Sequence, residues 1–488
     1  MRQRPTGSAF LNARLLAATA VIAVAIFPAS IPAATPAQPV AVDPLAHDIF
    51  KELIEINTTD SVGNVTTAAV AVQKRLLDAG FPQSDLALLG PNDRKKNLVV
   101  RFHGTGQHKP ILLIGHLDVV EARRADWTTD PFQFVEKDGF YYGRGTQDMK
   151  SGDAIMTAAL IRLRKENFHP QRDIILALTA DEETGSDNGV DWLIRNRRDL
   201  IDAQFVINHD TLSVMSEHGT PQFFELDATE KVYADYQLTV TSSGGHSSLP
   251  VPDNAINTLS QGLIRLAQFE FPFELNSVSR GYYQQMATIA TGQRAADMRA
   301  VVQASPDKQA IERLSHDPID HATLHTTCVA TRIDGGHANN ALPQKAEAVV
   351  NCRILPGHSP EEVRQNLISV LGNSHITVRY ISDDGTVLDT ASDRKGFPPP
   401  PLSAEIIAPL EKLVTTMWPN LKVVPTMQVG ASDAMYTMGA GLPTYAIAGI
   451  AVDRDDMRLH GRDERIGVQS FYVANEFFYR YIKALTSH

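Results

Sequence analysis

Short apolar runs that end in chemically reactive polar residues constrain the fold of this chain more than any other feature. The runs at 111–114, 174–178 and 205–207 each lead within a few residues into His, Glu or Asp. Continuous apolar runs are typical of strands buried on both faces, and helical segments alternate with them here. The alternation predicts an α/β fold with a mixed, mostly parallel sheet flanked by helices. Ligands of such sheets bind beyond the carboxyl ends of the strands, where these polar residues would gather.

The pattern changes near Lys231. Alternating apolar and polar residues at 236–240 indicate a half-exposed strand of a second, smaller sheet. A chain of 488 residues is long enough for two or three domains. We therefore expect one domain formed by 43–230 and 385–488, with a smaller α+β domain inserted at 231–384.

The N-terminal segment differs from the rest of the chain. Arginines precede an apolar run at 15–27, and small residues follow it, which predicts a secretory signal peptide at 1–37. The run is shorter than the roughly 20 apolar residues that span a bilayer, and an uncleaved anchor is the alternative interpretation. We expect a periplasmic or secreted protein with no membrane attachment after cleavage. The net charge of −11 argues against nucleic acid as a partner.

Two cysteines, Cys328 and Cys352, occur in strand-like stretches at 326–333 and 346–354. A Gly-rich turn separates the stretches, so a hairpin would place the cysteines face to face. Export would permit a disulfide. Two buried free thiols remain an equally good interpretation, because the geometry of a cross-strand disulfide is demanding.

His116 and Asp118 follow a buried strand directly, and in an extended chain they project to the same side. His116 could give a ring nitrogen to a metal ion while a carboxylate such as Asp118 fixes the orientation of the ring. This triplet is common, however, and a simple polar pair at a strand end is the alternative.

Carboxylates follow in two further places. Asp148 stands in a Gly-rich loop before the helical run at 155–163, where it could bridge two metal ions or only cap the helix. Three acidic residues at 181–183 come directly after a strand. Cations would relieve their mutual repulsion, and adjacent carboxylates could act as ligand and as general base. A solvated acidic loop is the alternative.

The strand at 205–207 ends in Asn208, His209 and Asp210, and either of the last two could bind a metal. His460 in a polar loop near the C-terminus is a further candidate ligand. Each of these signals is weak when taken alone. Their order along the chain is more informative.

In that order the motifs resemble the family of two-zinc amidohydrolases and metallopeptidases that includes aminoacylase, bacterial glutamate carboxypeptidase, succinyl-diaminopimelate desuccinylase and yeast carboxypeptidase S. The insertion at 271–325 resembles the carboxypeptidase S branch. Glu121 replaces a common proline, and the loop at 430–435 lacks the family's arginine, so we expect a modified substrate pocket. The matching motifs are Gly115-His116-Leu117-Asp118-Val119-Val120, Trp127 with Asp130-Pro131-Phe132, Gly143-Arg144-Gly145-Thr146-Gln147-Asp148-Met149-Lys150, Glu182-Glu183, Gly244-Gly245-His246-Ser247-Ser248, Asn340-Ala341-Leu342-Pro343 and His460.

The resemblance implies a role for each matching residue. Two Zn²⁺ ions are expected, with Co²⁺ or Mn²⁺ as alternatives. Glu182 would be the general base, which takes a proton from a metal-bridging water that attacks the carbonyl and passes it to the departing nitrogen. Asp118 would keep its orienting role. The implied ligands are His116 and Asp210 for one zinc, Glu183 and His460 for the other, and Asp148 as the bridge.

The resemblance also implies residues that bind substrate. His246 would stabilise the oxyanion in a partner subunit's active site, or in its own after closure. The inserted domain would then be a lid or a dimerisation domain, and the sequence leaves open whether the protein is a homodimer. Asn340 and Arg353 would bind the free carboxylate of the substrate. For Arg353, an ordinary surface position on a strand is the alternative.

We therefore predict an exported dizinc carboxypeptidase or dipeptidase that cleaves the amide bond to a C-terminal amino acid. An N-acyl-amino-acid amidohydrolase with the same machinery is the main alternative. A non-catalytic exported binding protein is less favoured, because every proposed ligand and base position carries a competent side chain. An aminopeptidase with a similar dizinc centre is a third alternative, which would require a free N-terminal amine in its substrate.

Overall fold

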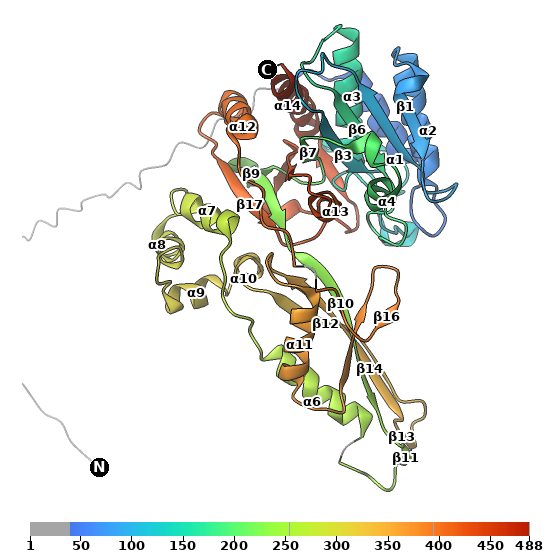
Figure 1. The fold of residues 1–488 in the computed structure, drawn as a ribbon, viewed down its shortest axis with the longest axis vertical. Coiled ribbons are helices and arrows are strands. Elements are labelled where there is room, and N and C mark those ends of the chain that lie inside the picture. The colour runs from blue at the N-terminus through green and yellow to red at the C-terminus, as the bar shows by residue number, and fades with distance from the viewer. Residues whose placement is uncertain (1–39, 253, 394, 488) are drawn as a thin grey trace, which may run out of the picture. The chain divides into compact units, whose positions relative to one another are not determined.

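The computed structural model describes residues 40–252, 254–393 and 395–487 (Figure 1). The predicted signal peptide, 1–37, lies outside these residues, so export stays a prediction. Within the described ranges, every helix is too short or too polar to span a membrane.

The larger sheet has ten strands in the order β1-β2-β6-β3-β7-β18-β9-β8-β19, with β17 beside β9. Its central strands β6, β3, β7 and β18 run parallel, whereas β2 pairs antiparallel with β6, and β1 pairs antiparallel with β2. The predicted α/β class with a mixed sheet is therefore confirmed. The strands are β1 (Leu86–Leu89), β2 (Asn97–Phe102), β3 (Ile111–His116), β6 (Ile174–Thr179), β7 (Phe205–Asn208), β8 (Val214–Glu217), β9 (Thr220–Glu230), β17 (Val423–Gln428), β18 (Thr444–Ala446) and β19 (Ala451–Asp453).

Helices cover both faces of this sheet, which explains its continuous apolar runs. Ile111 and Leu113 of β3 join the core with α1, α3 and α14, while Leu112 and Ile114 join a second core with α4 and α5. Alternate residues of one strand thus face opposite helical layers. The helices of this part are α1 (Pro44–Glu55), α2 (Val65–Asp78), α3 (Lys150–Lys165), α4 (Gly189–Asn196), α5 (Arg198–Ile201), α12 (Ala404–Met417), α13 (Ala434–Gly439) and α14 (Val468–Thr486), with short turns η1 (Gln83–Asp85), η2 (Arg124–Asp126) and η3 (Arg454–Asp456).

A second sheet has five antiparallel strands in the order β12-β14-β10-β15-β16 and a hydrophobic core of its own under α6 and α11. β9 ends in the large sheet at Glu230, and β10 begins in the second sheet at Val232, where the sequence pattern changes. The division into domains stays a prediction. The elements are β10 (Val232–Thr241), β12 (Thr327–Gly335), β14 (Lys345–Ile354), β15 (Thr377–Ile381), β16 (Val387–Leu388), α6 (Ala255–Ala267) and α11 (Pro360–Leu371).

The insertion at 271–325 is helical, a feature that the sequence analysis did not predict. Its helices share a small core, and α7 packs beside β17 of the large sheet. Of two further small sheets, one pairs β11 with β13, and the other has β5 between β20 and β4. These elements are α7 (Ser277–Met286), α8 (Gly292–Val301), α9 (Lys308–Leu314), α10 (Pro318–Leu324), β4 (Val135–Lys137), β5 (Phe140–Tyr142), β11 (Gly245–His246), β13 (Ala341–Leu342) and β20 (Arg465–Gly467).

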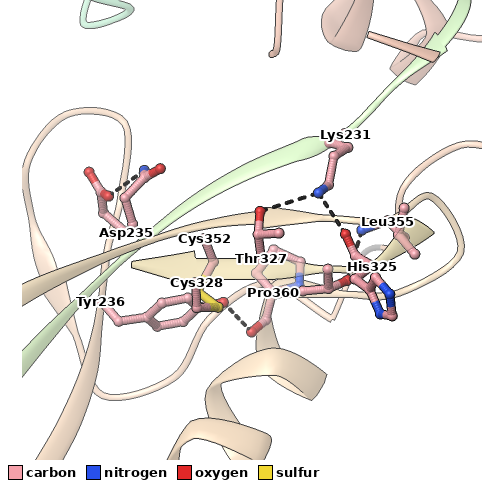
Figure 2. The surroundings of a disulfide bond; sticks show 11 residues. Lys231, Asp235, Tyr236, His325, Thr327, Cys328, Cys352, Leu355 and Pro360 are labelled. Carbon is pink, nitrogen blue, oxygen red and sulfur yellow. Dashed lines mark hydrogen bonds between the residues drawn. A yellow bond between two sulfur atoms is a disulfide. The ribbon is translucent and has the colours of Figure 1, made fainter. Parts of the chain in front are cut away.

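Cys328 and Cys352 form a disulfide between β12 and β14 (Figure 2). The two residues lie directly opposite each other in the antiparallel register. Of the two interpretations that the sequence left open, the structure therefore favours the disulfide over two free thiols.

Candidate metal centre

The predicted metal ligands gather at the carboxyl ends of three adjacent strands. His116, the last residue of β3, lies opposite Thr179, the last residue of β6. β7 pairs with β3 on its other side and ends at Asn208. Glu183 and Asp210 follow shortly after these ends, so the parallel pairing itself brings them to the edge of the sheet where His116 lies.

Asp148 lies between two histidine rings. Its Oδ1 is 3.0 Å from Nε2 of His116, and its Oδ2 is 3.0 Å from Nε2 of His460. Asp148 reaches this position from the loop before α3, and His460 from the loop before β20. Each carboxylate oxygen therefore faces a separate imidazole, which is the arrangement expected of a carboxylate that bridges two metal ions.

A second carboxylate accompanies each of the two histidines. Oδ1 of Asp210 is 3.9 Å from Nε2 of His116, and Oε2 of Glu183 is 3.1 Å from Nε2 of His460. His116, Asp148 and Glu183 offer ligand atoms that all lie within 4.8 Å of one another. The structure thus brings together the five residues to which the resemblance assigns metal binding, in the two expected pairs around Asp148. Their roles as ligands stay predictions.

The neighbouring His209 is turned toward α14. Its ring packs edge-on against Phe478, with 4.7 Å between the ring centres. The ring is buried, and neither nitrogen has a hydrogen-bond partner among the described residues. Burial lowers the pKa of His209 to about 3, so the ring is neutral. Of the two candidates at this strand end, Asp210 is the one placed to bind a metal.

Asp118 supports the cluster through the backbone. Its two carboxylate oxygens accept the N–H groups of Glu182 and Glu183 at 3.2 and 3.0 Å. Nδ1 of His116 donates to the backbone carbonyl of Asp118 at 3.1 Å, and the carboxylate itself is 3.8 Å away. The ring is therefore oriented mainly by the carbonyl, which leaves Nε2 free to bind a metal. Burial raises the pKa of Asp118 to about 6, although the charge of His116 opposes this shift.

The cluster concentrates negative charge in a buried place. Burial raises the pKa of Glu182 well above its usual range. Burial also raises the pKa of Asp210 to about 7, and the charge of Asp148 adds to this shift. Against the effect of burial, hydrogen bonds with His116 and His460 lower the pKa of Asp148. Divalent cations would compensate this like-charge repulsion.

Glu464 is a buried residue of this site that the sequence analysis did not single out. Its Oε1 accepts the backbone N–H groups of Gln147 and Asp148 at 2.6 and 3.1 Å, and its Oε2 accepts a hydrogen bond from Arg144 at 2.6 Å. One carboxylate thus fastens the loop of Asp148 to the loop of His460. The only sequence signal was its place four residues after His460, and a charged loop residue is usually solvated.

His246 and Asn340 lie in a small ribbon outside the metal cluster. His246 of β11 pairs with Ala341 of β13, and the N–H of Ser247 donates to the carbonyl of Asn340 at 3.1 Å. Nδ1 of His246 accepts the N–H of Ser248 at 3.1 Å, so the proton of a neutral ring is on Nε2. His246 therefore presents an exposed hydrogen-bond donor, as stabilisation of an oxyanion requires.

Arg353 lies at the opposite end of the five-stranded sheet from this ribbon. It pairs with Tyr233 near the start of β10, and its guanidinium is 4.6 Å from the centre of the Tyr233 ring. The ribbon lies beyond Lys345, at the other end of β14. At the rise of a strand, the distance from Lys345 to Arg353 is roughly 27 Å. One chain therefore does not bring Arg353 together with His246 in a single site.

The donor set of the cluster fits zinc. Imidazole nitrogens and carboxylate oxygens are common ligands of Zn²⁺. Oε1 of Glu183 is buried and has no hydrogen-bond partner within the described parts of the chain. A buried acceptor in this state is costly unless something binds it, and a cation would do so.

Comparison with known proteins identifies relatives over most of the chain. The sequence profile of peptidase family M20/M25/M40 matches residues 112–484. The chain belongs to this family. The resemblance drawn from the motifs is thereby confirmed, and this M20 protein is a metallopeptidase-type hydrolase that acts on amide bonds.

Individual relatives of the M20 chain agree with this assignment. Probable carboxypeptidase S-like 2 of Dictyostelium discoideum is 25% identical over 407 residues, which cover 79% of the chain and 74% of the relative. N-fatty-acyl-amino acid synthase/hydrolase PM20D1 of Mus musculus is 25% identical over 393 residues, which cover 77% and 74%. The crystal structure of the M20 family metallo-carboxypeptidase Sso-CP2 from Sulfolobus solfataricus matches this chain with a TM-score of 0.68 at 16% sequence identity. The match covers 91% of this chain and 100% of that one, so the two proteins share a fold.

Proposed function

We propose that this M20 protein is an exported two-zinc carboxypeptidase or dipeptidase that cleaves the amide bond to a C-terminal amino acid. The position of Asp148, with one oxygen toward His116 and the other toward His460, is the observation that carries the proposal. His116 and Asp210 would hold one ion, and Glu183 and His460 the other. Co²⁺ or Mn²⁺ could replace Zn²⁺ in this donor set.

When bound, the zinc pair would polarise the scissile carbonyl and lower the pKa of a water molecule. Glu182 is the general base of this proposal. A carboxylate oxygen of Glu182 takes a proton from the attacking water and gives it to the amide nitrogen as the bond breaks. The hydrogen bond from the backbone of Glu182 to Asp118 holds the base beside the ligand Glu183. Nε2–H of His246 donates to the oxyanion.

A homodimer is part of the proposal. His246 and Asn340 lie at one end of the five-stranded sheet, and Arg353 lies at the other end, so one chain cannot direct all three at one substrate. Arg353 lies close to Lys231, where β9 of the large sheet gives way to β10. A substrate carboxylate bound by Arg353 of one chain would then meet His246 and Asn340 of a second chain.

An N-acyl-amino-acid amidohydrolase is the second candidate, because a relative that covers 77% of the chain is named N-fatty-acyl-amino acid synthase/hydrolase. The two functions share the cleaved bond and differ only in the group on the acyl side. Export is supported by the predicted signal peptide and by the disulfide, because disulfides persist in oxidising compartments.

The decisive experiment measures hydrolysis of dipeptides and N-acyl amino acids, each with a free or an amidated C-terminus, by the zinc-loaded full-length protein. We expect turnover of the free acids that a chelator abolishes. Glu182→Gln should keep its zinc and lose turnover by at least about a hundredfold, as is typical for a general base. Glu136→Gln, an exposed change in β4, is the matched control. Unchanged turnover in Glu182→Gln, or equal turnover of amidated substrates, would count against the proposed roles of Glu182 and Arg353.

A further inference from the structure

A second group of metal-binding side chains lies away from the centre described above. Glu270 stands between α6 and α7, His321 lies in α10, and His325 directly follows α10. Their ligand atoms all lie within 4.8 Å of one another. None of the three is among the ligands proposed for the catalytic ions, so the proposed function leaves this group unexplained.

The spacing of the three side chains suits a tetrahedral ion. Oε1 of Glu270 is 3.6 Å from Nε2 of His321 and 3.5 Å from Nε2 of His325. Zinc bonds of roughly 2.1 Å place neighbouring tetrahedral ligands about 3.4 Å apart. His321 and His325 are four residues apart around one helical turn, which places both rings on the same side. Their ring centres are 5.0 Å apart.

The ring of His325 is held in the form that a metal requires. Its Nδ1 is 2.7 Å from the carbonyl oxygen of Phe271, which can only accept, so Nδ1 carries the proton. The lone pair is therefore on Nε2, beside Glu270. The hydroxyl of Ser315, 3.2 Å from Nε2, is the group that an ion would displace.

An ion can reach this group from solvent. A cavity of about 500 Å³ is lined by Glu270 and His321, together with the apolar side chains of Phe269 and Phe271. The exposed Glu270 and the partly buried His321 line the cavity, whereas His325 is almost completely buried. A hydrated ion could enter from the cavity and keep a water molecule as its fourth ligand.

The group lies beside a set of cross-links of the second sheet. Nζ of Lys231 donates to the carbonyl of His325 at 2.8 Å and to Oγ1 of Thr327 at 3.3 Å, and Cys328 follows with its disulfide (Figure 2). A metal here would tie the segment that carries Glu270 to α10 and to the start of β12.

We propose that Glu270, His321 and His325 form a separate Zn²⁺ site with a structural role, distinct from the catalytic centre. It stabilises the helical insertion against the five-stranded sheet and takes no part in hydrolysis.

The test compares the zinc content of full-length proteins after removal of metal and equilibrium dialysis against buffered Zn²⁺. Glu270→Gln and His321→Gln should each bind one Zn²⁺ per chain less than the unsubstituted protein and hydrolyse substrate at an unchanged rate. Glu274→Gln is the matched control. Like Glu270, Glu274 is an exposed acid of this segment, but it contacts a single histidine, His358, at 2.9 Å. The zinc content of the Glu274→Gln protein should therefore be unchanged.

The result depends on a difference in zinc content, so it holds whatever number of ions the catalytic centre binds. Added zinc should also raise the temperature of thermal unfolding more in the unsubstituted protein than in Glu270→Gln. Equal zinc content in the unsubstituted protein and both variants, or an equal effect of zinc on unfolding, would overturn the proposal. Loss of hydrolysis in the variants would contradict the separation of the two sites.

Discussion

Replacement of Glu464 with glutamine should loosen the metal centre without removing a ligand. Oε1 of Glu464 accepts the N–H groups of Gln147 and Asp148, and Oε2 accepts those of Gly145 and Arg144. Glutamine replaces one carboxylate oxygen with an NH₂ group, which cannot accept a hydrogen bond. Two of the four hydrogen bonds are therefore lost in either orientation of the side-chain amide. At roughly 1.5–3 kcal/mol for each hydrogen bond to a charged group, the expected cost is about 3–6 kcal/mol.

This cost should affect Asp148, because the lost hydrogen bonds involve either its own backbone N–H or Arg144 and Gly145 of the same loop. We expect Glu464→Gln to retain less zinc during dialysis and to lose kcat/KM at limiting zinc, with partial recovery at high zinc. Zinc content by mass spectrometry and turnover across a zinc titration measure both effects. Thermal unfolding measures the accompanying loss of stability.

Glu405→Gln provides a control for the loss of an ion pair to a buried arginine, although Glu405 itself is exposed and Glu464 is buried. Glu405 pairs with Arg172 at 2.5 Å, and Arg172 and Arg144 are each 2% exposed. The control should lower the unfolding temperature and leave zinc affinity intact. If Glu464→Gln binds zinc as tightly as Glu405→Gln does, the claim that Glu464 positions Asp148 is refuted.

Two further predictions concern the second sheet. The disulfide closes a loop with a sequence separation of 24. The double variant Cys328→Ala/Cys352→Ala should therefore lower the free energy of unfolding, measured in urea, by about 3.5 kcal/mol. An unchanged value would show that the cross-link does not restrict the unfolded chain. Burial lowers the pKa of Lys231 to about 7, so between pH 7 and about pH 9 the unfolded chain holds a proton that the folded chain has released. Lys231 should therefore make the free energy of unfolding rise by roughly 1.4 kcal/mol per pH unit in this range. The variant Lys231→Met should show a flatter dependence of unfolding free energy on pH. Equal slopes of this dependence in both proteins would contradict the prediction.

The sequence was sufficient wherever the controlling interactions are local. Apolar runs predicted β3, β6 and β7 because strands covered by helices on both faces need apolar residues at every position. The polar residues that follow those runs predicted a site at the strand ends, because parallel pairing aligns these ends. The motif order also predicted the family that the comparisons confirmed.

The sequence left open what depends on the direction of a side chain. His209 and Asp210 are adjacent, and only the packing of the His209 ring against Phe478 shows which of them faces His116. The helical insertion at 271–325 was not predicted, since its short helices bury only a small shared core.

The sequence by itself determined the fold class and the residue types available for chemistry, because burial and strand pairing follow from patterns that repeat every few residues. Only the tertiary structure decided that Asp148 lies between His116 and His460. It also decided that Glu464, in the loop of His460, binds the backbone of the loop that carries Asp148. It also separated Arg353 from the His246 ribbon and brought Glu270 to a pair of histidines. These contacts join segments far apart in the chain, and their geometry depends on how the cores pack rather than on any local pattern.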